Sequence, residues 1–208
     1  MLAAMLFPAF SSAKNAGNTT VTLANIRQLG EGFGLYEADY DDGLPSVTHG
    51  LLGEGKKGGW VYYFQFLDHG QAAGRFNVSK GTLYQYVKNK DVYLSANDPG
   101  SKSSGLSFAF NGCLSVPSME RGLSLSKPLN SIALPSGTML LGEEGTGISM
   151  FGAQAGTNDG YFNPVTDQFA EWHDGKTAIL FVDSHAKVTR AQSHLQEIVS
   201  GTVGGKCP

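Results

Sequence analysis

The chain has 208 residues, with 15 Lys and Arg against 18 Asp and Glu, and a net charge of −3. This balance excludes a typical nucleic-acid-binding protein, because such proteins carry a surplus of basic residues. Charged residues make up only 16% of the chain and aromatic residues 11%. We therefore expect one folded domain with a hydrophobic core of ordinary size rather than a disordered chain.

A long helix is predicted over residues 2–40. Apolar residues recur there in steps of three and four, which is the pattern of one helical stripe: Ile26, Leu29, Phe33, Tyr36 and Tyr40. The preceding segment, Leu2–Phe10, is apolar nearly all round, so we expect it to be buried by something other than this chain's own core. Pro8 and Gly17 predict a kink or local unwinding.

The remainder of the chain is predicted to form a head of strands, loops and short helices. Its C-terminal part has the pattern of a β-meander, in which the apolar strand 177–182 is central and turns its Ile179 and Phe181 toward the helical stripe. Trp172 and Val188 are expected to pack between sheet and helix as well. The fold class is therefore α+β, a long N-terminal α-helix packed on an antiparallel β-sheet, with a helix over 1–42 and a head over 43–208. The other expected elements are helices at 82–88 and 192–199, strands at 106–110, 138–141, 169–172 and 186–189, and a long loop at 142–160.

A series of short motifs follows in order along nearly the whole chain. These are Leu6-Phe7-Pro8, Asn25-Ile26-Arg27-Gln28-Leu29-Gly30, Tyr36-Glu37-Ala38-Asp39-Tyr40-Asp41-Asp42, Tyr86-Val87-Lys88-Asn89, Asn97-Asp98-Pro99, Ser107-Phe108-Ala109-Phe110-Asn111-Gly112, Pro135-Ser136-Gly137-Thr138, and His173 with Asp183 after nine residues. Together they resemble the bacterial type IV pilin-like proteins. More narrowly, they resemble the pseudopilin-like family that carries an H-x9-D-G element near its C-terminus.

The resemblance implies a pilin-like fold and a non-enzymatic structural subunit of an extracellular pilus or pseudopilus-like filament. Such a subunit is exported across the bacterial inner membrane, is held there before assembly, and polymerises with copies of itself and with other pilins. Its helices bundle in the centre of the filament, so the expected assembly residues are Leu2, Met5, Leu6, Phe7, Pro8 and Phe10. No cofactor is expected.

The chain departs from the family pattern at several positions. The Gly that follows the family's Asp is Ser184 here, and two positions that often hold cysteines are Thr22 and Ser95. The prepilin cleavage site is missing. About fifteen residues of a mature pilin helix would precede Leu2, so we expect a chain shortened at its start or numbered from an internal methionine.

His173 and Asp183 invite a metal or catalytic reading, but they lie at opposite ends of strand 177–182, about 20 Å apart. They cannot ligate one ion, and we expect both to be turn residues that fix the meander. Export would permit a disulfide between Cys113 and Cys207. Asn158, Asp159 and Asp167 are weak calcium candidates, because major pseudopilins hold calcium in a C-terminal loop and oxygen ligands in a flexible loop suit this ion.

The alternative class is an exported cell-surface binding module that does not polymerise. It would bind a polysaccharide or another ligand through Trp60, Tyr62 and Tyr63. Aromatic rings stack on sugars but also fill cores, so the sequence leaves this alternative open.

Overall fold

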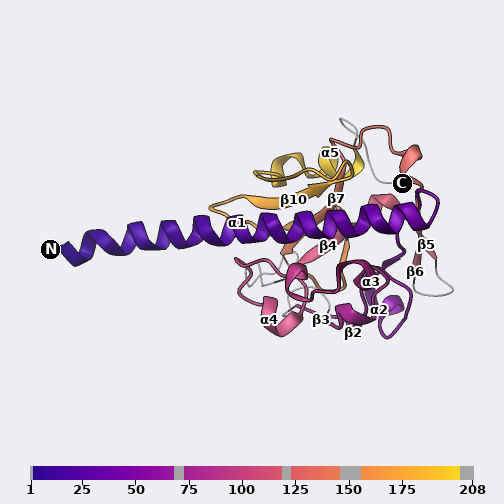
Figure 1. Cartoon of the computed structure of the whole chain (residues 1–208), viewed down its shortest axis with the longest axis horizontal. Helices are drawn as coiled ribbons and strands as arrows, with labels where there is room; N and C mark the ends of the chain where they lie inside the picture. The colour runs from indigo at the N-terminus through magenta and orange to yellow at the C-terminus, as the bar shows by residue number, and fades with distance from the viewer. Residues whose placement is uncertain (1, 68–72, 119–122, 146–155, 202–208) are drawn as a thin grey trace.

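The computed structural model describes residues 2–67, 73–118, 123–145 and 156–201, and for 2–9, 48, 116–118 and 123–125 it describes the backbone alone. The fold is α+β, as predicted. One long helix, α1, lies across a β-sheet and extends beyond the head at its N-terminal end (Figure 1).

Helix α1 (Leu2–Asp39) is uninterrupted over 38 residues, which confirms the predicted helix and shows that unwinding at Pro8 or Gly17 was a wrong prediction. Proline removes one backbone hydrogen bond, and the bonds of the adjoining turns maintain a helix of this length. The helix ends where Asp41 and Asp42 adopt positive φ angles of 50° and 59°. Asp tolerates this left-handed conformation better than most residues.

The main sheet has six strands. These are β4 (Phe108–Asn111), β7 (Met139–Gly145), β8 (Tyr161–Phe162), β9 (Gln168–Phe169), β10 (Thr177–Phe181) and β11 (Ala186–Thr189). Their order is β11-β10-β7-β4-β8, with β9 also paired to β7. All pairs are antiparallel except β4 with β8.

The predicted meander is right only for the β10–β11 hairpin. The expected strand 169–172 is shorter, and it pairs with β7 through Glu144 opposite Phe169 rather than with β10. The expected loop 142–160 is wrong at its start, because β7 continues to Gly145. Residues 146–155 of that loop lie outside the described residues.

The other elements surround this sheet. A second sheet has the order β1 (Val47–Thr48), β6 (Leu123–Ser126) and β5 (Ser115–Ser118), and a separate pair is formed by β2 (Tyr63–Gln65) and β3 (Arg75–Phe76). The short α-helices are α2 (Gly50–Gly53), α3 (Tyr84–Val87), α4 (Ser101–Ser104) and α5 (Leu195–Ser200). The 3-10 helices are η1 (Val78–Lys80), η2 (Asp91–Tyr93), η3 (Gly112–Leu114), η4 (Leu129–Ser131) and η5 (Gln192–His194). The predicted helices at 82–88 and 192–199 correspond to α3 and to η5 with α5.

The core has one hydrophobic cluster on each face of the sheet. The α1 stripe of Ile26, Leu29 and Phe33 packs with Leu180 and Val182. Ile179 and Phe181 belong instead to the second cluster, with Leu195 and Val199 of α5. The predicted facing of β10 is therefore wrong by one residue, and a one-residue shift exchanges the two faces of a strand.

Two further residues expected between helix and sheet, Trp172 and Val188, are only half-buried. The close approach of helix and sheet depends on a glycine, because a Cβ at Gly30 would lie only 3.0 Å from Leu180 Cδ1.

Candidate functional site

The N-terminal part of α1 projects beyond the head (Figure 1). Among the described side chains, the hydrogen bond to the head that lies nearest the start of α1 comes from Asn15. We call residues 2–14 the stem; at a rise of about 1.5 Å per residue it is about 20 Å long. Phe10 is 75% exposed.

The other expected assembly residues, Leu2, Met5, Leu6, Phe7 and Pro8, are placed on the helical backbone of the stem. Their side chains lie outside what the structure describes, so their contacts stay a prediction. In the part of the chain that is described, no helix combines the length and apolar composition that a membrane span needs.

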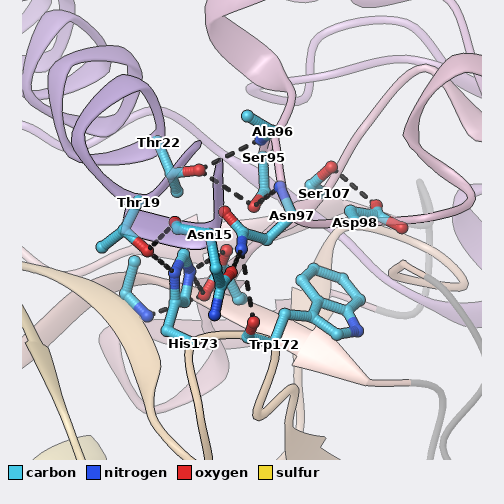
Figure 2. Close-up of polar contacts among 12 residues, drawn as sticks. Asn15, Thr19, Thr22, Ser95, Ala96, Asn97, Asp98, Ser107, Trp172 and His173 are labelled. Carbon is cyan, nitrogen blue, oxygen red and sulfur yellow. Dashed lines mark hydrogen bonds and ion pairs between the residues drawn. The ribbon is translucent and has the colours of Figure 1, made fainter. Parts of the chain in front are cut away.

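Past the stem, polar side chains attach α1 to the head (Figure 2). The central group is His173, which sequence reasoning treated only as a turn residue. It does lie in the turn before β10, but its ring is 3% exposed and joins two other elements. Nδ1 contacts Thr19 Oγ1 on α1 at 2.8 Å, and Nε2 contacts the two carboxylate oxygens of Glu143 on β7 at 2.9 and 2.8 Å. His173 therefore connects the helix to the sheet.

The hydrogen bonds of this chain constrain where the protons lie. The Glu143 carboxylate, which is 0% exposed, also accepts the backbone N–H of Ala178 at 2.7 Å. The Thr19 hydroxyl donates to the carbonyl of Asn15 at 2.9 Å. A hydroxyl has one proton to give, so with that proton on the carbonyl of Asn15 the Thr19 oxygen accepts from Nδ1 of His173. The Glu143 carboxyl group is hydrogen-bonded to Nε2 of His173 and to the backbone N–H of Ala178.

Hydroxyl, imidazole and carboxylate in line is also the order of a hydrolytic triad. Here the hydroxyl is bound to its own helix backbone, and the imidazole and the carboxylate are closed off from solvent. We interpret the group as an anchor of α1 rather than as a catalytic site.

A second contact lies one turn further along α1. The buried hydroxyls of Thr22 and Ser95 are hydrogen-bonded at 3.2 Å, and the backbone N–H of Ala96 donates to Thr22 Oγ1 at 3.0 Å. Asn25 then donates to the carbonyls of Asp91 and Leu94. The family that the chain resembles often has cysteines at the positions of Thr22 and Ser95, and these two residues are neighbours in space.

A signal for this anchor was present in the sequence. Asn15, Thr19 and Thr22 continue the spacing of the stripe Ile26, Leu29 and Phe33 in steps of four and three. Polar residues in a buried stripe need partners. Glu143 had no such signal, because its partner is distant in sequence. Adjacent residues of a strand point to opposite faces, and Glu143 and Glu144 accordingly have different surroundings.

Asp183 lies in the β10–β11 turn, at the other end of β10 from His173, so the two do not form one site. It accepts the ring N–H of His185 at 2.5 Å. Burial alone would raise the pKa of Asp183. The hydrogen bonds from His185 outweigh burial, so the pKa of Asp183 is lowered. The next residue, Ser184, has a φ of 70°, a conformation that glycine adopts without strain.

The three calcium candidates are buried around the carboxyl group of Glu144. Asp159 accepts backbone N–H groups of Gly50 and Tyr161, and Asp167 accepts that of Asn163. Burial raises the pKa of Asp159 to about 7 and that of Glu144 well above its usual value. Within the described ranges, no group of three or more His, Cys, Asp or Glu has the arrangement of a metal site. Calcium binding at Asn158, Asp159 and Asp167 stays a prediction.

Cys113 is buried within η3, and the described part of the chain contains no free cysteine. Its expected partner, Cys207, lies outside the described residues, so this pairing stays a prediction.

The aromatic residues expected of a binding module are mostly core residues. Trp60 and Tyr63 are 0% exposed, and Trp60 Nε1 donates to the carbonyl of Gly160 at 3.0 Å. Tyr62 is half-buried beneath the ammonium group of Lys80. The prediction that Trp60 and Tyr63 form a ligand-stacking surface is wrong.

Comparison of the chain with protein-family models, with curated proteins and with solved structures finds no match.

Proposed function

We propose that this chain is the structural subunit of an extracellular pilus or pseudopilus-like filament, and that it assembles through the stem. The observation that carries the proposal is the division of α1. One continuous helix is anchored to the head over its second half, while its first part projects beyond the head and its Phe10 is 75% exposed. A helix that is apolar all round is stable only when something buries it.

Two further observations support the pilin-like resemblance on which the proposal draws. The replaced cysteine positions, Thr22 and Ser95, are in contact although 73 residues separate them. Ser184 has the backbone conformation for which the family's glycine is suited. Neither relation was used to infer the resemblance.

The proposal includes the subunit's surroundings. The chain is exported across the bacterial inner membrane and held there before assembly. Its partners are copies of itself, together with other pilins, with the helices in the filament centre and the heads outside. It has no catalytic role.

The test is negative-stain microscopy of native material from cells that carry single substitutions. Wild-type material should contain filaments, and Phe10→Glu should abolish them, because a charge cannot be buried between helices without a partner. The matched control is Val165→Glu on the head, at a side chain that is 84% exposed, and it should leave filaments intact.

Circular dichroism of both variants should show a folded head. Discrete particles in the wild type would contradict the proposal and favour the non-polymerising binding module. Filaments that persist in Phe10→Glu would contradict assembly through the stem.

A further inference from the structure

A polar groove lies where the stem leaves the head. One of its walls is α1, with polar side chains between Ser11 and Asn18, and the other wall consists of the 96–97 segment and the turn at 172–174. Its volume is about 630 Å³, which lies within the ~300–1,000 Å³ of small-molecule sites. We call it the neck groove.

Trp172 is the aromatic residue of the neck groove. It is half-buried, but it belongs to neither hydrophobic cluster of the core and is not among the residues that pack against them. Its ring stacks on no described ring, and its Nε1–H donates to no described residue. In Figure 2 the ring extends away from the hydrogen-bonded side chains of Asn15 and Asn97. Trp172 therefore has an aromatic face and a hydrogen-bond donor available for a ligand.

The amide groups of the neck groove are held in place by one another. Asn15 donates to Asp174 Oδ1 at 2.7 Å, and Asn97 donates to Asn15 and to the carbonyl of Trp172. Asn18 donates to a backbone carbonyl on the opposite wall at 3.2 Å. The amide oxygen of Asn18 and the second carboxylate oxygen of Asp174 accept no hydrogen bond from a described residue. Both are fixed acceptors at the groove surface.

The α1 wall supplies donors as well. Ser11, Ser12 and Lys14 are exposed, and their side chains are bonded to no described residue. Lys14 is the sole charged side chain between residues 1 and 26, and Asp174 balances its charge within the groove. The groove thus combines donors, acceptors and one aromatic face without net charge.

We propose that the neck groove binds a neutral oligosaccharide. A sugar ring has hydroxyl groups around its edge and an apolar C–H face, so it matches a site with mixed donors and acceptors beside one aromatic ring. Trp172 stacks on the C–H face, while Lys14, Asn18 and Asp174 bond to the hydroxyl groups. A strongly anionic ligand would face a single lysine, and a wholly apolar one would leave the polar walls without partners. This site is additional to the proposed function.

The test is fluorescence titration of the full chain with cellotetraose, maltotetraose and chitotetraose. The chain has two tryptophans, and Trp60 is 0% exposed, so a change in emission reports on Trp172. At least one of the three sugars should change the emission at millimolar concentration, and isothermal titration calorimetry should give the same affinity. No response to any of the three would overturn the proposal.

Two substitutions locate the binding in the groove. Trp172→Phe should weaken binding by about tenfold, because it removes the indole N–H and part of the ring face. Lys14→Ala, which leaves the core untouched, should weaken it by roughly three- to tenfold. The matched control is Lys102→Ala at an exposed position of the head, which should bind as wild type does. Circular dichroism verifies that each variant is folded, and equal affinities in all variants would overturn the site.

Microscopy of the same variants separates this proposal from the proposed function. Lost sugar binding with intact filaments would support the site and leave the proposed function standing. Sugar binding by a wild type that forms no filaments would overturn the proposed function and leave the site standing. If the wild type binds no sugar and Trp172→Phe abolishes filaments, the groove is filled by a neighbouring copy and the sugar site is wrong.

Discussion

The two halves of α1 have similar backbones and opposite surroundings. The half from Asn15 onward contributes to the core and makes side-chain hydrogen bonds to three other parts of the chain. The stem projects beyond the head, and its Phe10 is exposed. Helix formation by itself does not explain a stem of this kind, because most helical stability in proteins comes from packing. The head stabilises the second half, and under our proposal other copies stabilise the first.

The strongest test of this contrast is the buried anchor. His173→Ala removes the donor that faces Glu143 and leaves a buried carboxylate with one backbone partner. Breaking a buried pair in this way should lower the free energy of unfolding by about 3–5 kcal/mol. The control is His185→Ala, whose exposed pair with Asp183 should be worth about 0–1 kcal/mol. Equal losses in urea denaturation would show that His173 is only a turn residue.

A paired truncation compares the two halves of the helix directly. Phe33 is 1% exposed in the core between Trp60 and Phe110, so Phe33→Ala should cost about 3–5 kcal/mol. Phe10→Ala should change the stability of unassembled subunits by less than about 0.5 kcal/mol. Thermal unfolding of dilute protein measures both. A large loss for Phe10→Ala would mean that the stem packs on its own head.

The contact of Thr22 with Ser95 can be converted into a covalent one. Both hydroxyls are buried and 3.2 Å apart, so Thr22→Cys with Ser95→Cys should form a disulfide under oxidising conditions. Closing a loop of this length should stabilise the subunit by about 2–4 kcal/mol. Reduction of the variant should reverse the gain. A variant that keeps both thiols free after oxidation would contradict the placement of α1 on the 95–97 segment.

A pH dependence should originate in carboxyl groups that are buried on folding, among them Asp98 in the head. Burial raises the pKa of Asp98 to about 6, although hydrogen bonds from Ser107 and Gly100 oppose the shift. The folded state then holds the proton more tightly than the unfolded state, so the free energy of unfolding falls as the pH rises from about 4 to about 6. At about 1.4 kcal/mol per pKa unit, Asp98 contributes at most roughly 3 kcal/mol.

The measurement is urea denaturation at pH 4.5 and pH 7.5. The raised pKa values of Asp159 and Glu144 act in the same direction. Asp98→Asn should reduce the difference between the two pH values, and an unchanged difference would contradict the role of Asp98.

Local patterns in the sequence were sufficient for α1, α3 and the β10–β11 hairpin, because helix stripes and turn residues are local signals. They were insufficient to predict which face of a strand packs on α1 and which strands pair with one another. Both faces of β10 are apolar and buried, so nothing local distinguishes Leu180 from Ile179 as the partner of α1. Thr19 lies in the helical stripe and so gave a signal for the anchor. Its partners Glu143 and His173 could not be predicted, because they meet Thr19 only after the helix has docked on the sheet.

The most direct test of the central claim is a helical reconstruction of native filaments by electron cryo-microscopy. The account predicts heads on the outside and stems inside, with Phe10 buried between copies. A filament in which the stem faces solvent, or in which copies contact one another only through their heads, would contradict it.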